Sequence, residues 1–347
     1  MPSRTRPLTF RLPRLEDTFS EFPDNGLNSH YTRCRAQSRD WINRYSKAIC
    51  GPKMRAFMDN CNFELSTSYV YPYAPSAGLR ATMDLVNILW LYDEFTDTVS
   101  GEQANHAAAV VYRTLQDPNF DDASWLSHMM KDFYQNHIQK CGPNVARRFI
   151  NNFCKYVELV GLEAELRERD QVLDMNSYIN FRRETSAVRT CFDLVEYCLG
   201  LDLPQYVHDD AVFISGYNAA MDLVFLANDL FSYNMEQAKG HSAANAVTVV
   251  MRSKVVDLQT AADVIADYCE VLTFQLLDAR HVLASRADPA FSEDAVRCLE
   301  AFGDWVRGNT AWSFETTRYF GKENKRIKET RIVKLTSPLR DADLLRK

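Results

Sequence analysis

Two short clusters of acidic and amide side chains have the residue types and spacing for metal chemistry. The first is the run 93–97, Asp-Glu-Phe-Thr-Asp. On a helix, Asp93 and Asp97 are four residues apart and project from one face, so two like charges lie side by side. No lysine or arginine occurs between Arg80 and Arg113 to neutralise them. Clustered carboxylate oxygens suit Mg²⁺, and the plain alternative is a solvated acidic turn at the end of a helix.

The second cluster combines three different oxygen donors on one strip of a helix. Asn228, Ser232 and Glu236 are spaced four residues apart, which places them on the same helix face. An amide, a hydroxyl and a carboxylate form a hard ligand set for Mg²⁺, which commonly shares phosphate oxygens with a substrate. Asp229 lies off that strip. Two incomplete Mg²⁺ sites imply a ligand that completes both, and a diphosphate would do so.

Basic residues should face the same place, because a diphosphate carries several negative charges. The candidates are Arg182 or its neighbour Arg183, then Lys239, and the pair Arg318-Tyr319 near the end of the last long helix. Each of them alone is most often a surface residue. Arginine offers phosphate oxygens a planar fork of donors, and the tyrosine adds a hydroxyl.

The elements that position these clusters are expected to be helices at the centre of a bundle. Residues 79–92 and 211–231 are apolar on nearly all faces, as in helices surrounded by other helices. Only 12 Gly and 12 Pro occur among 347 residues, too few for a fold rich in tight turns. The pattern predicts an all-α, single-domain helical bundle around an apolar central cavity. It comprises an irregular N-terminal leader (1–30), a catalytic domain (31–321) and a basic C-terminal tail or lid (322–347).

Composition excludes several other classes of protein. A net charge of −6 provides no overall basic field for nucleic acid. No run of about 18 uncharged apolar residues suggests a membrane span, and the N-terminus lacks the apolar core of a signal peptide. Nine scattered cysteines indicate reduced, mostly buried thiols. A cytoplasmic protein is expected.

At this point the sequence resembles the class I terpene cyclases, and more closely the sesquiterpene synthases of mushroom-forming fungi. The resemblance rests on DEFTD at 93–97, RRET at 182–185, NDLFSYNME at 228–236 and TTRYFG at 316–321. It covers the chain from about residue 20 to residue 321. Four motifs in this order are far more specific than one. No DxDD motif occurs, so chemistry initiated by protonation is not implied.

The resemblance implies a role for each polar residue at the cavity mouth. Asp93 matches the first aspartate of a motif that holds two Mg²⁺ ions, and Asp97 would either bind metal or orient its neighbours. Asn228, Ser232 and Glu236 match the triad that holds a third ion.

For the substrate, the resemblance implies hydrogen bonds to a diphosphate. Arg182 falls at the position of a diphosphate-sensing arginine, with Arg183 as the neighbouring alternative. Arg318 and Tyr319 match a pair that donates to the diphosphate. Lys239 would take the place of a lysine that some relatives carry just before the triad glutamate.

The implied reaction is the Mg²⁺-dependent ionisation of farnesyl diphosphate, followed by cyclisation of the cation to a C15 hydrocarbon or alcohol. Trp90, Trp312 and, by resemblance alone, Phe63 are candidates to line the cavity, with ordinary core packing as the competing interpretation. No obligate protein partner is expected. The alternatives are a chain-elongating prenyl diphosphate synthase, which would normally carry a second DDxxD box, and a non-enzymatic helical adaptor.

Overall fold

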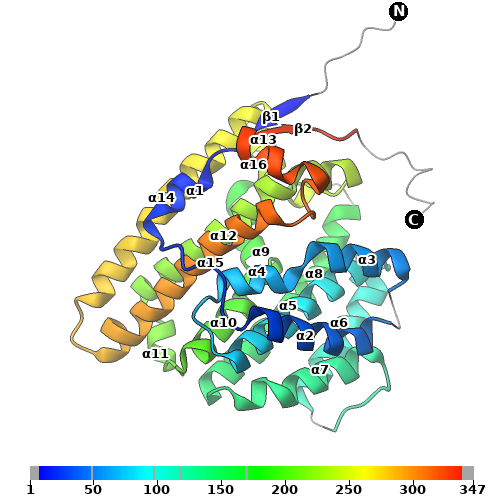
Figure 1. The fold of residues 1–347 in the computed structure, drawn as a ribbon, viewed down its shortest axis with the longest axis vertical. Helices are drawn as coiled ribbons and strands as arrows, with labels where there is room; N and C mark the ends of the chain where they lie inside the picture. Colours follow the sequence, from blue (N-terminus) through cyan, green and yellow to red (C-terminus); the bar gives the residue numbers. More distant parts are fainter. Residues whose placement is uncertain (1–7, 48–49, 97, 118, 169–170, 338–347) are drawn as a thin grey trace, which may run out of the picture.

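The computed structural model describes residues 8–47, 50–96, 98–117, 119–168 and 171–337, and these residues form a helical bundle (Figure 1). The α-helices are α1 (Leu15–Thr18), α2 (Tyr31–Ser46), α3 (Pro52–Cys61), α4 (Phe63–Val70), α5 (Ser76–Thr96), α6 (Gly101–Gln116), α7 (Trp125–Asn136), α8 (Pro143–Glu168), α9 (Met175–Thr185), α10 (Val188–Leu199), α11 (Gln205–His208), α12 (Ala211–Lys239), α13 (Ala246–Lys254), α14 (Leu258–Ala284), α15 (Val296–Glu315) and α16 (Asn324–Thr330). Shorter helical turns are η1 (Phe19–Glu21), η2 (Ile138–Lys140), η3 (Ser242–Ala244), η4 (Ala290–Ala295) and η5 (Gly321–Glu323). The predicted all-α fold is confirmed.

Helices α5 and α12 lie inside the bundle, as their apolar sequences predicted. Helix α12 packs against α14 and α15, and α5 packs against α2, α4 and α10 (Figure 1). Most side chains of both helices are buried. Within the described part of the chain, α12 is the one helix long and apolar enough to cross a membrane, with a mean hydropathy of 1.2 over its most apolar window. Because 67% of that window is buried by other helices, its composition is that of a core helix.

The two ends of the described chain pair with each other. Strand β1 (Thr9–Arg11) runs antiparallel to β2 (Ile332–Lys334), with Phe10 opposite Val333. The sequence pattern did not indicate this small sheet, because each strand is three residues long and its partner is distant in the chain. Five apolar side chains between residues 8 and 22 are buried: Phe10, Leu12, Leu15, Phe19 and Phe22. Residues 8–22 are therefore ordered against the bundle rather than irregular, and the three-part division of the chain stays a prediction.

The same two ends reach the outer side of α12. Thr336, just beyond β2, donates its backbone N–H to Asn234 Oδ1 at 2.8 Å, and Gln237 Nε2 donates to the Thr336 carbonyl at 2.8 Å. Phe10 packs edge-on against Tyr233, with ring centroids 6.1 Å apart. Both chain ends thus contact the last turns of α12.

Val255 ends α13 in an unfavourable conformation. Its φ is +53° and its side chain is 89% exposed, so a β-branched residue adopts the left-handed region with no compensating burial. Glycine is the preferred residue at this position after a helix. We expect Val255→Gly to raise the free energy of unfolding by about 1 kcal/mol, measured by chemical denaturation. An unchanged or lower value would contradict this account, and Val255→Ala, which keeps the strain, is the control.

Asp193 of α10 is a buried carboxyl that gives stability a pH dependence. Burial raises its pKa to about 7, and Asn152 Nδ2 donates to both of its oxygens at 2.9 and 3.1 Å. Because the native pKa lies above the unfolded value, the folded state holds this proton more tightly, and stability falls as the pH rises from about 4 to about 7. We expect Asp193→Asn to melt above the wild type at pH 8. The difference should shrink at pH 5, and a gap independent of pH would rule out this carboxyl as the cause.

Candidate active site

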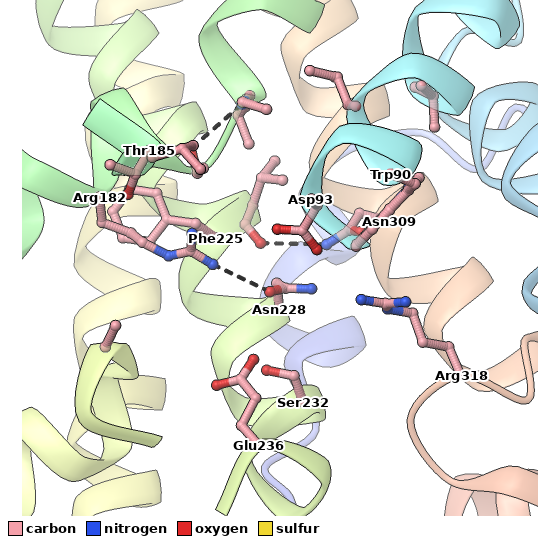
Figure 2. A pocket seen from close by; sticks show the side chains of 18 of the residues that line it. Trp90, Asp93, Arg182, Thr185, Phe225, Asn228, Ser232, Glu236, Asn309 and Arg318 are labelled. Atoms are coloured by element: carbon pink, nitrogen blue, oxygen red, sulfur yellow. Dashed lines mark hydrogen bonds between the residues drawn. The ribbon is translucent and has the colours of Figure 1, made fainter. Parts of the chain in front are cut away.

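A cavity of about 220 Å³ opens between α5, α8, α9, α10, α12 and α15. Its mouth is polar: Asp93 approaches from α5, next to Trp90, and Asn228, Ser232 and Glu236 approach from α12 (Figure 2). Earlier on the same two helices the lining residues are apolar, with Val86 and Leu89 on α5 and Val224 and Phe225 on α12. The two helices that the sequence singled out therefore meet at one site.

The three oxygen donors of α12 all line the cavity, as their spacing predicted. Asn228, Ser232 and Glu236 follow one another along one strip of the helix (Figure 2). The Ser232 hydroxyl is buried and makes no hydrogen bond of ordinary geometry among the described residues, although the Glu236 carboxylate lies near it. A buried hydroxyl without a partner is costly unless a ligand satisfies it, so the strip fits a bound cation.

Asp93 contributes a further carboxylate from the opposite side of the mouth. It is half-buried and lines the cavity (Figure 2). Asp97, the second acid of the predicted pair, lies outside the described residues. Across the described ranges, no three His, Cys, Asp or Glu side chains form a metal-binding group. The donor set therefore also depends on the amide and hydroxyl oxygens of α12, a composition that suits a hard divalent cation.

The electrostatics of the α12 strip favour a positive ligand. Burial raises the pKa of Glu236, and the nearby Asp229 carboxylate raises it further. A divalent cation at Glu236 would offset both effects, because an opposite charge favours the ionised form of a carboxyl group. The same arrangement would bind metal less well as the pH falls.

The structure distinguishes the adjacent arginines that the sequence left ambiguous. Arg182 lines the cavity, and its Nη2 donates to Asn228 Oδ1 at 3.5 Å and to Asp229 Oδ1 at 3.3 Å (Figure 2). Arg183 is not among the residues that line it, and forms a two-pronged ion pair with the buried Asp222, at 2.8 and 2.7 Å. Arg182 is therefore the arginine placed to meet a ligand.

Arg318 and Tyr319 follow α15 and close another side of the mouth. The Arg318 guanidinium lies 4.0 Å from the centroid of the Trp90 ring, and its Nη1 is 3.4 Å from Glu94 Oε1. The Tyr319 hydroxyl accepts a hydrogen bond from Asn228 Nδ2 at 2.8 Å. The predicted pair thus touches both α5 and α12. Glu94 was not predicted as a partner, because nothing local in the sequence indicates its contact with a residue 224 positions away.

The aromatic predictions are partly supported by the geometry. Trp90 and Trp312 line the cavity, and so does Lys239 at the end of α12. Phe63 is not among the lining residues: it is 1% exposed and stacks on Trp90, with ring centroids 4.6 Å apart. It lies behind Trp90 in α4, which packs against α5 and α15 and contributes Ser66 to the lining instead.

Several lining residues carried no signal in the sequence. The most notable group, residues 186–188, leads from α9 into α10, where Ala187 has a φ of +62° and breaks the helix beside the cavity. Asn309 of α15 also lines the cavity and donates to the Val224 carbonyl at 3.3 Å (Figure 2). A single amide in a helix of mixed composition does not indicate a cavity residue.

Comparisons with known proteins show the family of the chain. Residues 84–273 match the family described as "Terpene synthase family 2, C-terminal metal binding". The chain is 68% identical over 346 residues to a sesquiterpene synthase of Sphaerobolus stellatus, covering 100% of both chains. It is 69% identical over 332 residues to one of Cyclocybe aegerita, covering 96% of this chain and 77% of that protein.

Solved structures give the same fold at much lower identity. Hedycaryol synthase in complex with HEPES superposes with a TM-score of 0.76 at 22% identity, covering 87% of this chain and 98% of the other. A germacradien-4-ol synthase of Streptomyces citricolor has a TM-score of 0.72 at 21% identity, covering 82% and 96% of the two chains. The chain belongs to the terpene synthase family, with its metal-binding domain, and within that family to the sesquiterpene synthases of basidiomycete fungi.

Proposed function

We propose that this sesquiterpene synthase uses Mg²⁺ to ionise farnesyl diphosphate and cyclises the resulting cation to a C15 hydrocarbon or alcohol. One observation carries the proposal: oxygen donors and two arginines converge at one end of a cavity that apolar and aromatic residues line earlier on α5, α12 and α15. The polar mouth suits a diphosphate with its counter-ions, and the apolar depth suits an isoprenoid chain. The substrate class agrees with the names of the relatives, which are sesquiterpene synthases.

Four described residues would hold the metal: Asp93, Asn228, Ser232 and Glu236, together with Asp97 from the undescribed position. We expect three Mg²⁺ ions when diphosphate is bound. The chemistry that bound Mg²⁺ supplies is neutralisation of the charge that develops on the leaving group. The buried Ser232 hydroxyl and the raised pKa of Glu236 support this assignment.

The basic residues would bind the diphosphate and stabilise it as it leaves. Arg182, Arg318 and Tyr319 can donate to its oxygens from two sides of the mouth, and Lys239 adds a positive charge. To do so, Arg318 exchanges part of its contact with Glu94 for the diphosphate. The C–O bond then breaks, its electron pair stays on the diphosphate, and an allylic cation remains in the cavity.

The deeper cavity would fold the chain and protect the cation from water. Trp90, Trp312, Trp305 and Phe225 present aromatic surface to the cavity, and the faces of such rings attract positive charge. Exclusion of water prevents early capture of the cation. The departed diphosphate can accept the final proton, so no separate base is required.

The test is incubation of the purified protein with farnesyl diphosphate and Mg²⁺, with an EDTA control, followed by gas chromatography–mass spectrometry. We expect a metal-dependent cyclic C15 product. Longer prenyl diphosphates that form only with added isopentenyl diphosphate would replace the proposal with a chain-elongating synthase. No release of diphosphate under any condition would favour the helical adaptor. We further propose that residues 31–321 form the catalytic domain, and that the enzyme acts in the cytoplasm without an obligate protein partner.

A further inference from the structure

Asn245 joins the metal-binding end of α12 to the beginning of α13. It is fully buried, at 0% exposure. Its amide nitrogen donates to Glu236 Oε2 at 3.0 Å and to the Asp229 carbonyl at 2.9 Å. Its amide oxygen accepts from the Val247 backbone N–H at 2.9 Å, which caps α13. One side chain therefore uses both of its donors on α12 and its acceptor on α13.

The residue after Asn245 extends the same connection to Arg182. The backbone N–H of Ala246 donates to Asp229 Oδ2 at 3.0 Å, and the Tyr178 hydroxyl donates to the same oxygen. Asp229 Oδ1 in turn accepts from Arg182 Nη2 at 3.3 Å. The start of α13 thus fixes the triad glutamate directly and the cavity arginine through Asp229.

These contacts restrict the carboxylate of Glu236. A glutamate side chain has three rotatable bonds, and its free rotamers would have to be ordered when a metal ion binds. With Oε2 held from α13, the carboxylate already keeps one orientation on the strip that also carries Asn228 and Ser232. In metal sites generally, such partners orient the ligand, and their loss typically weakens metal binding about 10–100-fold.

We propose that Asn245 is a positioning residue for this synthase: it holds the Glu236 carboxylate in the orientation that receives the metal ion. The inference rests on the proposed function, in which Glu236 is a metal ligand. The competing account is that Asn245 only caps α13, a role that serine and aspartate perform as well as asparagine does.

The variant Asn245→Ser distinguishes the positioning of Glu236 from the capping of α13. A serine hydroxyl can still cap α13, but it is too short and has too few donors to bond both Glu236 and the Asp229 carbonyl. The binding of Mg²⁺ with inorganic diphosphate is measured by calorimetry, and thermal unfolding is recorded in parallel. We expect Mg²⁺ affinity to fall at least about 10-fold. The matched control is Asp257→Ala, which removes the exposed cap of the next helix, α14, and should lower stability without changing Mg²⁺ affinity.

A second variant keeps the test decisive if the serine variant does not fold. Asn245→Asp preserves size and the cap but lacks both amide donors, and it should also bind Mg²⁺ more weakly in the presence of diphosphate. Wild-type affinity in either folded variant would overturn the positioning role. If the wild type itself shows no binding of Mg²⁺ and diphosphate, the proposed metal site fails instead, and the two failures are therefore distinguishable.

Discussion

Replacing Asn228 with Leu and Ser232 with Ala in one variant is expected to lower product formation by more than about 10³-fold. Two of the proposed metal ligands on α12 are lost, and the hydrogen bonds of Asn228 with Tyr319 and Arg182 are lost with them. The fold should persist, because leucine and alanine favour a helix. Turnover of farnesyl diphosphate and the far-UV circular dichroism spectrum are the two measurements.

The single variant Ser232→Ala is the control for stability. The hydroxyl makes no hydrogen bond of ordinary geometry among the described residues, and Glu236 keeps its bond from Asn245 when the hydroxyl is removed. We expect a melting temperature at least as high as that of the wild type, together with a higher Mg²⁺ requirement. Full activity of the double variant would remove α12 from the metal site and would invalidate the proposed chemistry.

Arg182→Lys is expected to reduce kcat by about 10²-fold or more. Lysine retains the charge but loses the planar fork, so it cannot reproduce hydrogen bonds to both Asn228 and a diphosphate. Asp229 would keep its bonds to Tyr178 and Ala246, so the protein should remain folded. Steady-state kinetics and thermal unfolding test the two parts separately.

The neighbouring variant Arg183→Lys is the matched comparison. Arg183 makes a two-pronged bond to Asp222, which is 0% exposed. Weakening that pair leaves a buried carboxylate poorly compensated. We expect a clear loss of stability and a much smaller change in kcat than for Arg182→Lys. A larger loss of kcat for Arg183→Lys than for Arg182→Lys would mean that Arg183, rather than Arg182, binds the diphosphate.

The part of the site that could be predicted from the sequence is the part determined within one helix. The spacing of Asn228, Ser232 and Glu236 fixes a common face wherever α12 lies, and the apolar runs around Trp90 and before Asn228 identify central helices. Both conclusions need only local periodicity. The residues that they indicated line one cavity in the structure.

The remaining features depend on contacts between distant segments. Arg182 and Arg183 are adjacent, so their side chains point about 100° apart around α9. Arg182 contacts Asp229 and Arg183 contacts Asp222, two turns apart on α12, and only these contacts between helices distinguish the two arginines. Phe63 was expected at the cavity but lies behind Trp90. Whether a side chain of α4 reaches the cavity depends on how α4 packs against α5. No local pattern contains this information.

The pairing of β1 with β2 brings the two ends of the described chain together, so the helices could be connected in a different order along the chain. The backbone N–H of Leu335 donates to the Leu8 carbonyl at 2.9 Å, so a short linker from residue 337 to residue 8 could join the ends without crossing the cavity. A circular permutant opened between Asp121 and Asp122, in the exposed connection between α6 and α7, is expected to fold and to retain activity. In that protein, a fusion partner would leave from the α6–α7 side rather than from beside the last turns of α12.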